Sequence, residues 1–92
     1  MEREVVLFKS KEVMGRDQVA AFLRQLADKV ESGNVTLQSG QQELPLTLPA
    51  DLQLEVEVED EQKSRGIEHC LEVEIKWYDD GVTGPRGGVS LK

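Results

Sequence analysis

Two stretches of this chain alternate apolar and charged residues, and this period of two constrains the fold more than any other feature. One stretch runs from Leu52 to Glu59, and the other runs from Ile67 to Tyr78. Successive side chains of a β-strand point to opposite faces of its sheet. Both stretches are therefore predicted to be long strands, each with one apolar face and one acidic face. The polar residues 60–66 between them are predicted to form a loop.

A helix is predicted before these strands. Gly15 is an acceptable cap for its first turn, and Gln18 is placed to accept a hydrogen bond from the cap amide. Gly33 supplies the left-handed residue that ends a helix. Between these ends, apolar residues recur at helical spacing and form one stripe: Val19, Phe22, Leu23, Leu26 and Val30.

Three shorter strands complete the predicted set of elements. Residues 4–9 are β-branched and aromatic enough for a first strand. Residues 35–38 and 44–48 alternate in the same way as the long strands. Pro45 restricts the second of these to a sheet edge, because proline cannot donate to a strand ladder.

The element order β-α-β-β-β-β predicts an α+β fold. We expect a single antiparallel sheet of about five strands, with the amphipathic helix packed on one face against the long strands. Phe22, Leu23 and Leu26 should then be buried against the apolar face of these strands. Residues 1–80 are predicted to form one domain. Residues 81–92 hold four of the eight glycines and are predicted to be a flexible tail.

Composition limits the possible functions. The 92 residues are 38% hydrophobic and 4% aromatic, which leaves little core to enclose a substrate pocket. Eighteen acidic residues against 11 basic ones give a net charge of -7, so we expect neither nucleic acid nor a membrane as partner. Cys70 is the single cysteine, and residues 5–8 are too short an apolar run for a signal peptide or membrane span. We therefore expect a cytoplasmic protein.

The residues that could carry catalysis are sparse. His69 and Cys70 are the single members of their kinds. Neighbours on a strand face opposite ways, so these two cannot form a nucleophile–base pair or share a metal ion. We predict that His69 lies at the rim of the apolar face, that Cys70 is a small filler on the outer face, and that the chain is not an enzyme and needs no cofactor.

The glutamates of the long strands are the strongest candidate for a binding surface. Six would line the outer face of a hairpin: Glu55, Glu57, Glu59, Glu68, Glu72 and Glu74. One register places Glu59 opposite Glu68. A slide by two residues along one strand instead places Glu57 opposite Glu72. In either register like charges meet, which is destabilising unless salt, a divalent cation, Lys76 or a basic partner relieves the repulsion. The alternative is a solvated face without a ligand.

Trp77 closes the second long strand. It shares the apolar side with Ile75, which favours a place in the last core layer. At an exposed edge it would instead be a binding anchor, because tryptophan is enriched at interaction hot spots. The predicted interaction surface comprises Glu55, Glu57, Glu59, Glu72, Glu74 and Trp77.

Several segments, in this order, resemble the amphi-Trp domain of prokaryotic proteins. They are residues 19–30, Gly33, residues 35–37, Leu48-Pro49, residues 54–58 and residues 71–77, which end at Trp77. The similarity runs from about Val5 to Trp77. It implies a small cytoplasmic prokaryotic domain and brings no activity, substrate or catalytic residue with it.

The leading hypothesis is a small, non-catalytic, acidic protein-interaction module. Its partner would be a protein with a basic or extended segment, bound at the acidic face or at an exposed strand edge. The alternatives are a structural homodimer, a weak divalent-cation-binding domain and, less favoured, an enzyme subunit. A monomer is favoured over a homodimer, because two copies would each carry the charge of -7.

Overall fold

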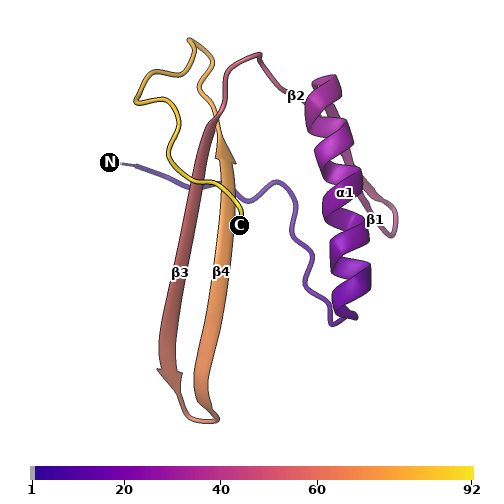
Figure 1. The fold of residues 1–92 in the computed structure, drawn as a ribbon. Helices are drawn as coiled ribbons and strands as arrows, with labels where there is room; N and C mark the ends of the chain where they lie inside the picture. Colours follow the sequence, from indigo (N-terminus) through magenta and orange to yellow (C-terminus); the bar gives the residue numbers. More distant parts are fainter. Residues whose placement is uncertain (1) are drawn as a thin grey trace. The chain divides into compact units, whose positions relative to one another are not determined.

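The computed structural model describes residues 2–92, which form one helix and four strands (Figure 1). The elements are α1 (Arg16–Ser32), β1 (Asn34–Ser39), β2 (Gln42–Thr47), β3 (Gln53–Lys63) and β4 (Gly66–Lys76). β1 pairs with β2, and β3 pairs with β4, in two separate antiparallel sheets. The chain divides between Leu48 and Pro49 into two compact units.

The prediction of a single five-stranded sheet is wrong. The order is α-β-β-β-β, and residues 4–9, expected to be the first strand, have no regular secondary structure. This segment has no strand ladder. A side chain of β2 contacts it, since Gln42 Nε2 donates a hydrogen bond to the Leu7 carbonyl at 3.0 Å. Each remaining strand pairs with its neighbour along the chain. Short turns close such hairpins at little entropic cost, whereas joining them into one sheet requires pairing between distant segments.

Helix α1 begins and ends as its sequence predicts. The Gly15 N–H donates to Gln18 Oε1 at 3.0 Å, so a side chain satisfies an amide at the first turn. Gly33 follows the last turn with φ 84°, in the left-handed region, and its N–H donates to the Val30 carbonyl at 3.0 Å. Local residue chemistry therefore sets both ends of this helix.

The core of the first unit is small and lies around β1. Val35 is 5% exposed and Leu48 is 9% exposed. Helix α1 contacts β1, and Leu26 and Val30 of its apolar stripe are half-buried. Phe22 and the rest of the stripe toward the start of the helix remain exposed, at 43–53%. The expectation that Phe22 would be buried is therefore wrong.

The second unit is built on the β3–β4 hairpin. Each strand has 11 residues, and they pair along their whole length, from Gln53 opposite Lys76 to Lys63 opposite Gly66. The loop predicted over residues 60–66 is therefore reduced to a turn at Ser64 and Arg65.

No helix in residues 2–92 combines the length and the apolar character that crossing a lipid bilayer requires.

Candidate interaction surface of the hairpin

The register of β3 and β4 sorts the hairpin into two chemically distinct faces. Residues directly opposite each other on paired strands share a face. Glu57 lies opposite Glu72, as in the second of the two registers predicted from the sequence, and Val56 lies opposite Val73. The acidic face comprises Glu55, Glu57, Glu59, Glu61, Glu68, Glu72 and Glu74. The apolar face comprises Leu54, Val56, Val58, Ile67, Leu71, Val73 and Ile75.

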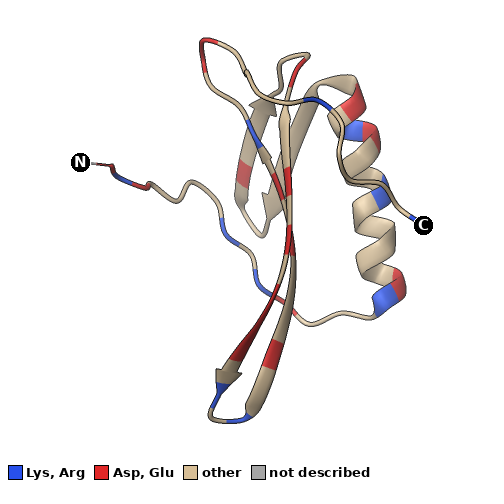
Figure 2. Cartoon of the chain, turned by 60° about the vertical axis from the view of Figure 1, so that its left-hand side comes forward, with Lys and Arg blue, Asp and Glu red and all other residues tan. Residues whose placement is uncertain are grey.

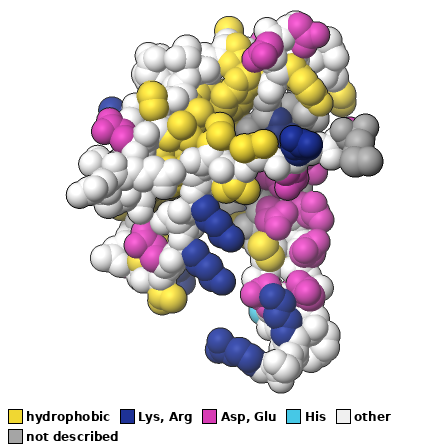
Figure 3. All heavy atoms as spheres, turned by 180° about the vertical axis from the view of Figure 1, so that it is seen from behind, with side chains coloured by type: hydrophobic (Ala, Val, Ile, Leu, Met, Phe, Trp, Pro, Cys, Tyr) yellow, Lys and Arg dark blue, Asp and Glu magenta, His cyan; other side chains and the backbone are white. Residues whose placement is uncertain are grey.

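The acidic face brings together five of the six residues of the predicted interaction surface, namely its five glutamates. It also contains Glu61, which belongs to the segment predicted to be a loop. Figure 2 shows the acidic residues along both strands of the hairpin, and in the space-filling view of Figure 3 acidic side chains form a strip. This face is therefore longer than predicted.

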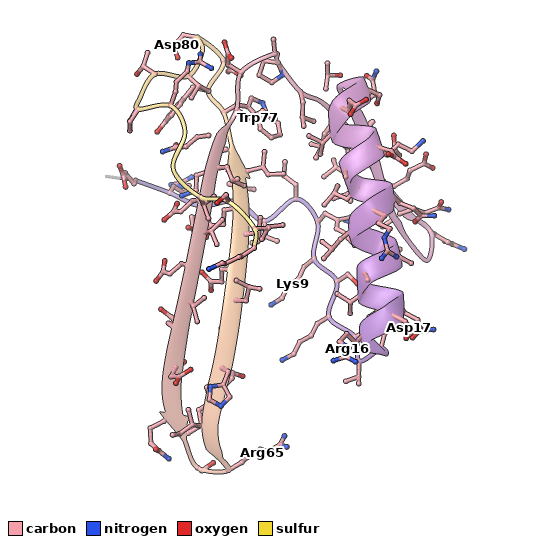
Figure 4. All side chains as sticks on the ribbon, viewed as in Figure 1. Lys9, Arg16, Asp17, Arg65, Trp77 and Asp80 are labelled. Atoms are coloured by element: carbon pink, nitrogen blue, oxygen red, sulfur yellow. The ribbon has the colours of Figure 1, made fainter. Side chains whose placement is uncertain are left out.

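Trp77 is the predicted residue that the structure does not place on the acidic face. It follows directly after β4, at the end of the hairpin opposite to the turn that contains Arg65 (Figure 4). Its side chain is half-buried, which lies between the predicted core position and the predicted exposed anchor.

Two lysines neutralise the ends of the acidic face. Lys76 Nζ lies 2.7 Å from Glu55 Oε2 and 3.1 Å from Glu74 Oε2. The hydrogen bond to Glu55 contributes most, and with the hydrogen bond to Glu74 it raises the pKa of Lys76 above its ordinary value. Near the turn, Lys63 Nζ lies 3.1 Å from Glu68 Oε1. Both ends of the face therefore carry ion pairs.

The centre of the acidic face has no such compensation. Within residues 2–92, none of the three central glutamates, Glu57, Glu59 and Glu72, forms an ion pair with a basic residue, and neither does Glu61 opposite Glu68. A hydrogen bond with Glu59 and repulsion from its charge, followed by smaller contributions from desolvation, Glu55 and Glu74, raise the pKa of Glu57. The carboxylates at the centre therefore repel one another in the folded chain.

We expect Glu57→Gln to raise the melting temperature at low ionic strength and neutral pH, because the amide keeps the shape of the side chain and removes its charge. Added salt should narrow the difference from the wild type by screening the repulsion. Circular dichroism at low and high salt would measure both effects. Glu43→Gln, on an exposed position of β2, is the matched control.

The pH dependence of this difference follows from the direction of the pKa shift. An acid whose pKa is raised by folding stabilises the native state below its ordinary pKa, and this stability is lost as the pH rises through the raised value. The advantage of Glu57→Gln should therefore be present at neutral pH and disappear in acid. Equal melting temperatures of the two proteins at neutral pH and low salt would contradict the prediction.

His69 and Cys70 point to opposite faces, as their adjacency on β4 predicts. His69 Nδ1 lies 2.7 Å from Asp60 Oδ1, and this exposed pair interrupts the apolar face between Leu71 and Ile67. Cys70 lies on the acidic face, where its Sγ donates to Glu72 Oε1 at 3.6 Å. Burial, together with Glu72, raises the pKa of Cys70, so its thiol stays protonated at neutral pH.

The described residues contain no group of three His, Cys, Asp or Glu side chains placed to hold a metal ion.

Comparison with known proteins identifies one family. The model of the Amphi-Trp domain matches residues 1–92, the whole chain. The match extends past the similarity noted in the sequence, which ended at Trp77, and it includes the residues predicted to be a tail. No curated protein and no solved structure matches the chain.

Proposed function

This chain belongs to the amphi-Trp domain family, and from that premise we propose that it is a non-catalytic protein-interaction module. Its β3–β4 hairpin receives an extended, basic segment of a partner protein. The segment adds to the hairpin as a further strand, with its basic side chains continuing the acidic face.

The observation that carries this proposal is the two-faced hairpin with free edges. In the described part of the chain, β3 and β4 pair only with each other, so each has one edge on which backbone N–H and C=O groups have no neighbouring strand. Main-chain hydrogen bonds at such an edge give affinity, and alternate side chains give specificity. A segment that alternates apolar and basic residues would extend both faces at once.

Charge favours a foreign segment over a second copy of this chain. Side-by-side addition of a second hairpin would place its central glutamates next to those of the first, where like charges across a ladder are destabilising. Lysine or arginine at the same positions would instead meet Glu57, Glu59 and Glu72, whose charges lack basic partners among the described residues. The module therefore acts as a monomer that binds a basic strand.

A designed peptide of alternating lysine and valine tests this proposal, with a glutamate–valine peptide of equal length as control. We expect the lysine peptide to bind and the glutamate peptide not to bind, with an affinity that falls as salt rises. Upon binding, alternate amides along one strand of the hairpin should become protected from hydrogen exchange. Equal binding of both peptides, or protection outside the hairpin, would refute the proposal.

Two protein variants make the test specific to the acidic face. The double variant Glu57→Gln/Glu72→Gln should weaken binding of the lysine peptide by about tenfold, since two exposed charge pairs contribute up to about 1 kcal/mol each. The double variant Glu31→Gln/Glu43→Gln removes the same charge elsewhere and should bind almost as the wild type does. Light scattering on the free protein gives the molecular mass, and a stable dimer would contradict the monomeric module.

A further inference from the structure

The C-terminal segment, residues 82–92, returns over the base of the apolar face of the hairpin. In Figure 1 this part of the chain crosses in front of β3 and β4, and all three belong to the same compact unit. A hollow of about 810 Å³ lies between the segment and the first half of β3. From the hairpin, Leu54 and Val56 line this hollow, and from the segment Val82, Arg86 and Val89 line it.

One ion pair fastens the segment to the start of β3. Arg86 Nη1 lies 3.2 Å from Asp51 Oδ1, and both side chains are well exposed. Upstream, a turn after β4 directs the chain back, since the Gly81 N–H donates to the Tyr78 carbonyl at 3.2 Å. An exposed pair of this kind contributes little stability, so the attachment is weak and reversible.

The segment shields part of the apolar face. Val56 is 41% exposed and Ile75 is half-buried, whereas Val58 and Leu71, nearer the turn, are 71% and 70% exposed. Leu54 at the base and Ile67 beside the turn are both 56% exposed, so the shielding is confined to a few positions. Val82 of the segment is itself half-buried. The segment therefore covers the apolar face around Val56 and leaves the rest open.

The chemistry of the segment matches that of the partner proposed above. Within a chain of net charge -7, residues 82–92 contain two basic residues, Arg86 and Lys92, and no acidic one. They also carry apolar side chains at Val82 and Val89, which line the hollow with the hairpin. The segment thus offers the hairpin the combination of apolar and basic side chains that an added strand would offer.

We propose that residues 82–92 form an internal cover that competes with the partner for the hairpin. This inference rests on the proposed function and adds regulation to the same hairpin, because an added strand must extend the apolar face as well as the acidic one, and the segment lies over the base of the apolar face. In the covered state the segment occupies the base of the apolar face. A partner displaces it by breaking one exposed ion pair and weak apolar contacts.

Charge reversal at the ion pair tests the cover in the full chain. Arg86→Glu should release the segment, and Lys92→Glu makes the same charge change without touching Asp51. Release should increase the fluorescence of a dye that binds exposed apolar surface, and it should shift the methyl resonances of Val56 and Val89, which line the hollow from its two sides. The double variant Asp51→Arg/Arg86→Glu should restore both signals by reversing the pair.

The lysine–valine peptide then tests the competition. When most molecules are in the covered state, the apparent affinity for the peptide equals the affinity of the open state multiplied by the open fraction. Arg86→Glu should therefore bind the peptide about three to ten times more tightly than Lys92→Glu does, and the charge-reversed double variant should return to the wild-type affinity.

The two readouts separate the cover from the proposed function. Unchanged dye fluorescence and unchanged methyl resonances in Arg86→Glu would overturn the cover, as would a dimer in which the segment lies on a second copy. If the dye and methyl signals change as expected but no variant binds the peptide, the binding function falls and so does the competition. If the wild type binds the peptide, and Arg86→Glu and Lys92→Glu bind it with equal affinity, the competition is overturned and the binding function stands.

Discussion

We expect Leu48→Ala to lower the free energy of unfolding of the first unit by about 2–4 kcal/mol. Leu48 and Val35 are the two residues that form its buried core, at 9% and 5% exposure. Removing three buried carbons loses the transfer free energy of the side chain and leaves a cavity that neighbours fill only in part. A core this small offers few other contacts to take over the loss.

Chemical denaturation followed by the helix signal of circular dichroism measures this effect, because α1 is the one helix of the described chain. Leu91→Ala is the matched control, since Leu91 is 101% exposed and its truncation should change stability by less than about 0.5 kcal/mol. If both variants unfold at the wild-type denaturant concentration, Leu48 is not a core residue in solution.

We expect Gly33→Val to lower the free energy of unfolding by about 1–3 kcal/mol, because of backbone strain. Gly33 has φ 84°, a conformation in which a β-branched side chain is strained. Space is not the obstacle, because a Cβ at this position would meet the Leu48 carbonyl oxygen at an ordinary distance of 3.6 Å. The loss would reach two elements, since the Gly33 carbonyl also accepts the Leu48 N–H at 2.8 Å.

The comparison with Gly33→Asn isolates the backbone contribution. Asparagine tolerates the left-handed region better than other residues that carry a Cβ, so this variant should lose less than half as much stability as Gly33→Val. Thermal unfolding of the two variants side by side measures the difference. Equal losses would show that the side chain is excluded by packing and not by the backbone conformation.

The parts of the fold that depend on local chemistry were predictable from the sequence. Gln18 and Gly33 cap the helix as expected, because capping involves residues within one turn. Strict alternation set the faces of the hairpin, and the sequence reduced its register to two possibilities, one of which is observed. Sheet membership could not be predicted in the same way. The composition of residues 4–9 suits a strand, yet composition does not specify a pairing partner.

The candidate site shows the same division. Glu57 and Glu72 share a face because of their spacing, which the sequence displays directly. Glu61 was missed because the polar run from Asp60 to Lys63 interrupts the alternation and is typical of a loop. Its signal was its spacing, since Glu61 continues the every-second-residue series of Glu55, Glu57 and Glu59. The contact of residues 82–92 with the hairpin was missed because glycines break the apolar pattern there. The absence of acidic residues from this segment was the available signal.

The hairpins also bear on how quickly the chain can fold. Within each unit, the element pairings join neighbours along the chain: α1 with β1, β1 with β2, and β3 with β4. Such low contact order is associated with folding in microseconds to milliseconds, since little loop entropy is lost before native contacts form. The first unit, which ends at Leu48, contains both partners of each of its own pairings. Its helix and hairpin can therefore form without waiting for the acidic strands to pair.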